Sequence, residues 1–199
     1  MNYYDLIATS FQSTIESIAM SVDNLAGPIE SGSELLASAL LNDQKIISCG
    51  SGVDATLAQQ FASNLLSRFE HDRPALPALA LGGDGGSLTA ILQSNGINDI
   101  FSRQLRALGQ PGDILLCINS SRNSPGLLRA IQAAHERNMR VVALSNNGDS
   151  ELSALIGLED IEISVAMQRQ ARIVELHTMT LNCLCELLEH RLFGGYNQE

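Results

Sequence analysis

The sequence predicts a single α/β domain in which helices cover both faces of a mostly parallel sheet. Short apolar segments alternate with helical segments along the chain, which is the order of βαβ units. These apolar segments are nearly continuous, as is typical of strands that are buried on both faces. The chain has 199 residues, 45% hydrophobic and only 4% aromatic, so it suits one domain whose core is filled by aliphatic side chains.

Apolar positions at helical spacing predict two helices before the first strand, over about 4–25 and 29–41. Five strands are predicted at 45–49, 78–81, 113–119, 140–145 and 160–165. Further helices are predicted at 55–69, 88–92, 100–108, 125–137 and 171–192. We treat residues 1–199 as one domain, with N-terminal helices in 1–43 and the α/β core and final helix in 44–199. The N-terminal helices have no strand of their own to cover, so we expect them on the domain edge or against a neighbouring subunit.

Composition excludes several classes of protein. The net charge of −10 and the pI of about 4.7 argue against direct nucleic-acid binding. No signal peptide is evident, and no apolar run approaches the length of a membrane span. The four cysteines form no C-x-x-C pair and are expected to be reduced. The sequence therefore predicts a cytoplasmic protein whose partners are proteins or small ligands.

Two loops follow predicted strands at the edge where parallel sheets bind ligands. The first is CGSGVD, residues 49–54, and the second is NSSRNS, residues 119–124. The second offers hydroxyls, side-chain amides and the free backbone amides of the helix that begins at Pro125, a combination that suits a phosphate group. The alternative is a polar turn in which Ser124 only caps that helix.

Four stretches carry a family resemblance: KIISCGSG, FASNLLSRFEHDRPALPALAL, NDIFSRQLRALGQPGDILLCINSSRNS and ARIVELHTMTLNCLCELLEHRLF. They are similar to the SIS (sugar isomerase) family, and within it to the phosphoheptose isomerase branch. The resemblance implies a flavodoxin-like three-layer αβα domain with a central parallel sheet, a homotetramer, and phosphosugar sites shared between subunits. The phosphosugar-binding residues expected from the two loops are Ser51, Asn119, Ser120, Ser121, Asn123 and Ser124.

The same resemblance implies that the side chains at the catalytic positions of this chain have no acid, base or metal-binding group. Moving a sugar carbonyl between C1 and C2 requires a base and an acid, which in these isomerases are groups that also bind zinc. The matching positions here are Gln60, Asn64, Ser94, Val174 and Asn182. Neither an amide nor a valine can act as a general base, and amides are weak zinc ligands. No catalytic residue and no metal ligand are therefore expected at these positions.

Two ionisable residues near the expected site have competing interpretations. Asp54 stands where the branch usually has a serine, so its charge would repel a phosphate; alternatively it caps the next helix and turns away. His177 lies on the final helix without an evident carboxylate partner. We expect it to be a core histidine rather than a displaced catalyst.

The segment NCLCELLEHRLF is especially similar to a non-catalytic relative, the initiator-associating protein DiaA, which binds the replication initiator DnaA. The main expectation is therefore a phosphosugar-binding protein of DiaA type, without catalysis or cofactor, that acts by binding DnaA. The alternative is a phosphoheptose isomerase that converts sedoheptulose 7-phosphate to D-glycero-D-manno-heptose 7-phosphate, and zinc is expected only in that case. A third possibility is a phosphosugar sensor with no link to the initiator.

Overall fold

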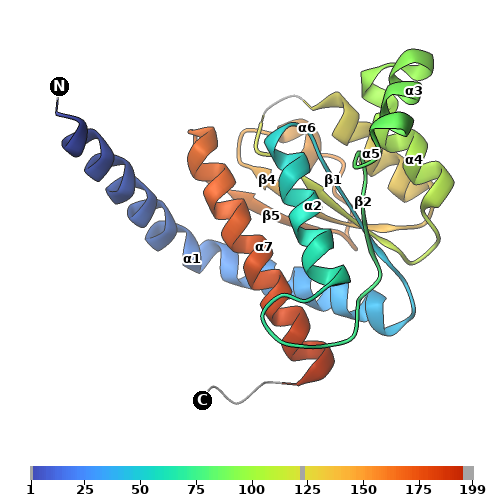
Figure 1. The fold of residues 1–199 in the computed structure, drawn as a ribbon, viewed down its shortest axis with the longest axis horizontal. Helices are drawn as coiled ribbons and strands as arrows, with labels where there is room; N and C mark the ends of the chain where they lie inside the picture. Colours follow the sequence, from blue (N-terminus) through green and yellow to red (C-terminus); the bar gives the residue numbers. More distant parts are fainter. Residues whose placement is uncertain (1, 122–123, 195–199) are drawn as a thin grey trace.

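A five-stranded parallel sheet forms the centre of the domain (Figure 1). The computed structural model describes residues 2–121 and 124–194. Its strands are β1 (Ile46–Gly50), β2 (Ala78–Ala80), β3 (Ile114–Ile118), β4 (Arg140–Asn146) and β5 (Ile161–Val165). They lie in the order β2-β1-β3-β4-β5, and every neighbouring pair is parallel. The expected α/β architecture with a parallel sheet is confirmed.

Helices cover both faces of this sheet. They are α1 (Tyr3–Leu41), α2 (Val53–Leu66), α3 (Gly85–Asn95), α4 (Ile100–Leu108), α5 (Pro125–Glu136), α6 (Ser150–Ser153) and α7 (Gln170–Phe193), with a short 3₁₀ turn, η1, at Ile97–Asp99. Successive strand side chains point to opposite faces. Leu116 thus joins the core formed with α1, α2 and α7, whereas Leu115 joins the core formed with α4, α5 and α6.

The N-terminal region is one helix, not the two that the sequence predicts. Proline removes a backbone donor and usually breaks a helix, yet α1 continues through Pro28. Its C-terminal half is held by tertiary packing, with Leu36 fully buried and Gly32 so close to β5 that a Cβ there would lie 3.3 Å from Ile163 Cδ1. Burial against the sheet and α7 therefore outweighs the lost hydrogen bond.

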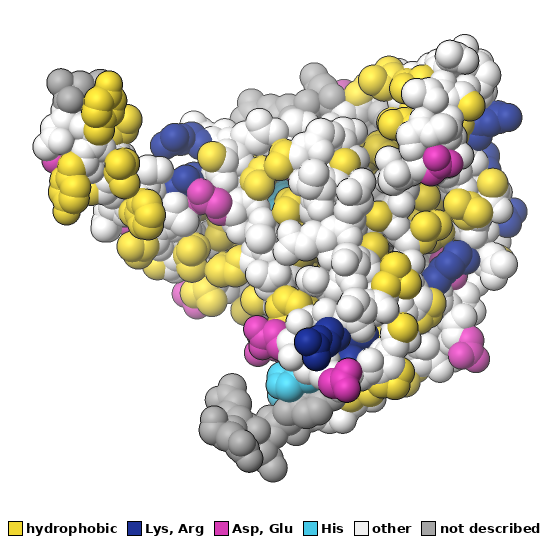
Figure 2. All heavy atoms as spheres, viewed as in Figure 1, with side chains coloured by type: hydrophobic (Ala, Val, Ile, Leu, Met, Phe, Trp, Pro, Cys, Tyr) yellow, Lys and Arg dark blue, Asp and Glu magenta, His cyan; other side chains and the backbone are white. Residues whose placement is uncertain are grey.

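The first part of α1 projects away from the sheet and exposes a row of large apolar side chains (Figures 1 and 2). Tyr4 is 75% exposed and Phe11 is 71% exposed. The contact with the domain begins about two turns into the helix, where Arg172 on α7 donates to the Ser10 carbonyl at 2.7 Å. Within residues 2–121 and 124–194, no helix combines the length and the apolar character that a bilayer crossing requires.

The strand order fixes where a ligand can bind. The chain leaves β1 toward β2 on one side and then crosses to β3 on the other, so β1 and β3 are neighbours at which the winding reverses. In parallel α/β sheets a crevice opens at the carboxyl ends of the strands at such a point. The topology thus brings together the two loops that the sequence singles out.

Candidate phosphosugar site

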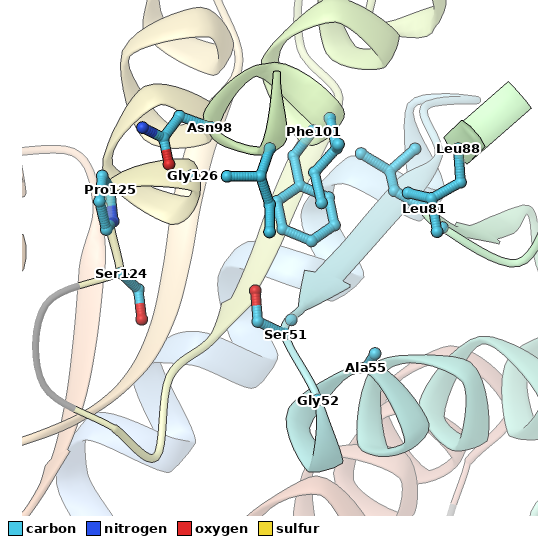
Figure 3. A pocket seen from close by; sticks show the side chains of 14 residues that line it. Ser51, Gly52, Ala55, Leu81, Leu88, Asn98, Phe101, Ser124, Pro125 and Gly126 are labelled. Atoms are coloured by element: carbon cyan, nitrogen blue, oxygen red, sulfur yellow. The ribbon is translucent and has the colours of Figure 1, made fainter. Parts of the chain in front are cut away.

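A cavity of about 380 Å³ opens at the carboxyl end of β1, beside the beginning of α5 (Figure 3). Ser51 lines it from the loop after β1, and Ser124 and Gly126 line it from the N-terminus of α5. Asn98 and Phe101 close it from the segment before and within α4. The first amides of a helix have no intrahelical acceptor and carry a positive partial charge, so this wall suits an anion. The remaining apolar lining suits the carbon chain of a small ligand.

Asn98, Phe101 and Gly126 line the cavity but are not among the binding residues that the sequence predicts. The first two belong to the stretch NDIFSR, which carries part of the family resemblance. The family resemblance of this stretch was therefore the sequence feature that could have identified Asn98 and Phe101 as lining residues. Gly126 contributes backbone rather than a side chain, so no residue-type argument could identify it.

The loop after β1 depends on two glycines. A Cβ at Gly50 would lie 2.5 Å from both the carbonyl carbon and the carbonyl oxygen of Asp54, so no larger residue fits without a backbone shift. Gly52 has a φ of 61°, in the left-handed region, and it is the residue that precedes α2 as its N-cap. Asp54 is therefore not the cap of this helix, and that predicted alternative is wrong.

The Asp54 side chain instead crosses to the loop after β3. Its Oδ2 accepts hydrogen bonds from the backbone N–H of Ser120 at 2.9 Å and from the Ser120 hydroxyl at 3.0 Å. Asp54 is only 2% exposed, and its Oδ1 is buried with no hydrogen-bond partner among the described residues. Burial raises the pKa of this carboxyl, and the two bonds from Ser120 oppose that rise.

Asn119 organises the rest of the second loop. Its Oδ1 accepts from the Ser121 hydroxyl at 3.2 Å and from the Ser124 hydroxyl at 2.9 Å, and its Nδ2 donates to Asp149. Ser124 occupies the N-cap position of α5, but its side chain makes no capping bond because it is used by Asn119. The loop is thus held by its own side chains.

The structure separates the residues that were expected to hold a phosphosugar. Ser51 and Ser124 line the 380 Å³ cavity at the carboxyl end of β1, which we call the main cavity because it lies at the strand ends. Ser120 and Ser121 line a smaller hollow of about 250 Å³, where Gln170 Nε2 donates to Ser120 Oγ at 3.2 Å. Asn119 is fully buried behind the loop, and Asn123 lies outside the described residues.

The five positions matched to catalytic residues do not line the main cavity. Gln60 is exposed on α2, and the Asn64 amide lies 3.9 Å from the sulfur of Cys185 on α7. Val174 packs against the core and Asn182 is half-buried on α7. Ser94 is exposed on α3, where its hydroxyl donates to the Ala90 carbonyl.

These side chains do not fit a zinc ion. Zinc sites in proteins use thiolates, imidazoles and carboxylates, whereas the matched positions offer amides, a hydroxyl and a valine. The neighbouring thiol of Cys185 is no substitute, because burial raises its pKa to about 12 and keeps it protonated. Within the described part of the chain, no three His, Cys, Asp or Glu side chains are placed to hold a metal.

His177 is a buried histidine of the core. It has no exposed surface, and its Nε2 donates to the Ser145 carbonyl at 3.1 Å. Burial lowers its pKa to about 4, although the bond to Ser145 opposes this shift. The imidazole is therefore neutral at pH 7, and it does not line the main cavity.

The fold and the cavity define an α/β domain with a cavity at the carboxyl ends of its strands whose lining suits a small anionic ligand. Residues 10–146 match the SIS domain family, and the chain belongs to that family. The phosphoheptose isomerase of Chromohalobacter salexigens is 43% identical over 195 residues, covering 98% of this chain and 99% of that protein. The solved phosphoheptose isomerase of Francisella tularensis is 36% identical with a TM-score of 0.91, covering 96% of this chain and all of that one. The corresponding structure from Neisseria gonorrhoeae is 34% identical with a TM-score of 0.89, covering 94% and 99% of the two chains.

These comparisons correct the main functional expectation. The sequence predicts a non-catalytic protein of DiaA type that acts by binding DnaA. The near-full-length relatives named above are phosphoheptose isomerases instead, which favours the alternative that the sequence analysis keeps open. The expectation gave most weight to five exchanged side chains, whereas the similarity extends over the whole chain.

Proposed function

We propose that this protein is a phosphoheptose isomerase that converts sedoheptulose 7-phosphate to D-glycero-D-manno-heptose 7-phosphate. The observation that carries the proposal is the 43% identity to such isomerases over 98% of the chain. A cavity at the strand ends, with hydroxyls and a helix N-terminus in its wall, is consistent with a sugar phosphate as ligand. The proposal also places the reaction in the cytoplasm.

In this proposal the main cavity binds and orients the substrate. The Ser51 hydroxyl and the first amides of α5 would hold the phosphate, while Phe101 and Leu88 would contact the carbon chain. The described lining contains no carboxylate, imidazole or amine, so a single chain does not offer a base for the enediol step there. We therefore propose that a neighbouring copy completes the site. The reaction would proceed without zinc at the five matched positions, because their side chains do not fit that ion.

The test is conversion of sedoheptulose 7-phosphate by protein purified from a strain that lacks its own phosphoheptose isomerase. Carrying out the reaction in D₂O and following it by NMR should reveal the aldose product with deuterium at C2, the mark of an enediol step. Turnover should persist in a chelator. Ser51→Ala should lower kcat/KM about tenfold, since a hydrogen bond to a charged group is lost. Ser38→Ala, exposed on α1, is the control and should match the parent. No turnover beside an active isomerase would overturn the proposal.

We also propose that the protein is a homotetramer. The apolar side chains on the projecting part of α1 support this proposal, because exposed apolar surface of this kind marks interaction sites. They are Tyr4, Ile7, Phe11, Ile15 and Ile18. Light scattering should give four times the 21.4 kDa mass of one chain, and the mass of a single chain would contradict the proposal.

A further inference from the structure

Asp54 places a negative charge inside the loop that was expected to bind phosphate. It lies at the second position of α2, where a small side chain would leave Ser120 free. The backbone carbonyl of Asp54 lies close to Gly50 at the end of β1. A Cβ on residue 50 would prevent this close approach. The Asp54 carboxylate is buried and accepts two hydrogen bonds from Ser120, so it is not a mobile surface charge.

The carboxylate uses the donors that an oxyanion would need. Both the N–H and the O–H of Ser120 point to Asp54 Oδ2, at 2.9 and 3.0 Å. The hydroxyls of Ser121 and Ser124 are directed to Asn119 Oδ1. Hence the three described serines of this loop donate to side chains of the protein itself, and one oxygen of Asp54 accepts from both donors of Ser120.

The other carboxylate oxygen of Asp54, Oδ1, has lost its contact with water without gaining a hydrogen bond from the described residues. Oδ1 is buried without a partner among the described residues, and a buried acceptor in that state is unfavourable. Asp54 as a whole is 2% exposed, so water screens its charge poorly. A dianionic phosphate beside Ser120 would be repelled by Asp54, and the hydroxyls of the described serines there already donate to Asp54 and Asn119.

We propose that Asp54 is a specificity-determining residue, an internal anion that occupies the Ser120 end of the loop and weakens the binding of phosphate groups. Phosphate is then restricted to the Ser51 and Gly126 side of the main cavity, and the neutral part of a sugar ligand is unaffected. Asp54 thus lowers the affinity for phosphorylated ligands below the affinity that the same fold would have without this charge. This inference rests on the proposed sugar-phosphate site but not on turnover.

The test compares the parent protein with Asp54→Asn and Asp54→Ser by calorimetry at neutral pH and low salt. The probes are inorganic phosphate, sedoheptulose 7-phosphate and unphosphorylated sedoheptulose. Both variants should bind the two phosphate-containing probes about tenfold tighter or more, because a poorly screened charge is removed. Asp54→Ser also removes the acceptor of the Ser120 donors, whereas the amide oxygen of Asp54→Asn can still accept from them, so the serine variant should gain at least as much. Their affinity for sedoheptulose should not change.

The matched control is Asp84→Asn, which removes an exposed carboxylate and keeps an oxygen for the α3 cap. Its phosphate affinity should stay within about twofold of the parent if long-range charge contributes little. Folded Asp54 variants that bind phosphate no tighter, or that gain equally for sedoheptulose, would overturn the inference. Because inorganic phosphate is the probe, an inactive protein can still support the inference and an active one can still refute it.

Discussion

Mild acid should destabilise this protein through His177. The folded protein holds the imidazole neutral in the core, with its pKa lowered to about 4 by burial from an ordinary value of 6.5. In the unfolded chain the same group takes up a proton as the pH falls below 6.5, so the unfolded state then binds more protons than the folded state. Stability must therefore fall as the pH decreases from 6.5 to about 4, and the loss from this group is complete below that window.

The size of this effect follows from the two pKa values. A fall from 6.5 to about 4 corresponds to roughly 3 kcal/mol of lost unfolding free energy once the pH lies below both values. At pH ~5.5, the unfolded imidazole is about nine-tenths protonated and the folded one remains neutral. The expected loss relative to neutral pH is then about 1.4 kcal/mol.

The measurement is urea unfolding at pH ~7.5 and pH ~5.5 for the parent and for His177→Gln. Glutamine retains an N–H that can reach the Ser145 carbonyl but has no proton to take up in this range. The parent should lose about 1.4 kcal/mol more than the variant between the two pH values. His190→Gln, which removes an exposed imidazole from the same helix, should keep the pH dependence of the parent. Equal losses in the parent and in His177→Gln would refute the reasoning.

Two further predictions concern stability. Gly50→Ala should lower the unfolding free energy by about 3 kcal/mol and the melting temperature by roughly 5–10 °C, because the new Cβ would lie 2.5 Å from the Asp54 backbone. Gly85→Ala, where nothing lies within 4 Å, is the control, and equal melting of the two variants would contradict the steric argument. Arg73→Met should lose about 3 kcal/mol, since it removes the 2.9 Å ion pair that holds Glu189 in the interior. Arg106→Met breaks an exposed pair of the same length and should lose less than about 1 kcal/mol; urea unfolding that ranks them the other way would contradict this prediction.

The sequence by itself determined the architecture. Strand signals at 45–49, 78–81, 113–119, 140–145 and 160–165 each fall within about a residue or two of a strand in the structure. The predicted helix at 100–108 matches α4, Ile100–Leu108. Such elements are encoded locally, because the periodicity of apolar residues follows the geometry of the element that buries them. The short elements α6 and η1 were missed, since four or three residues are too few to carry a period.

Only the tertiary structure decided how α1 and the two loops behave. The sequence predicts separate helices at about 4–25 and 29–41, but packing of the residues after Pro28 onto the sheet and α7 keeps α1 continuous. The sequence predicts one phosphate site from the loop residues, whereas in the structure Ser124 lines one cavity and Ser120 lines another, and the two serines donate to Asn119 and Asp54 respectively. The bond from Ser120 to Asp54 joins residues that are 66 positions apart in the chain, and no local pattern records that these two meet. The periodicity of apolar residues therefore predicted the fold. Which donors and acceptors pair at the site depended on contacts between distant parts of the chain that form only on folding.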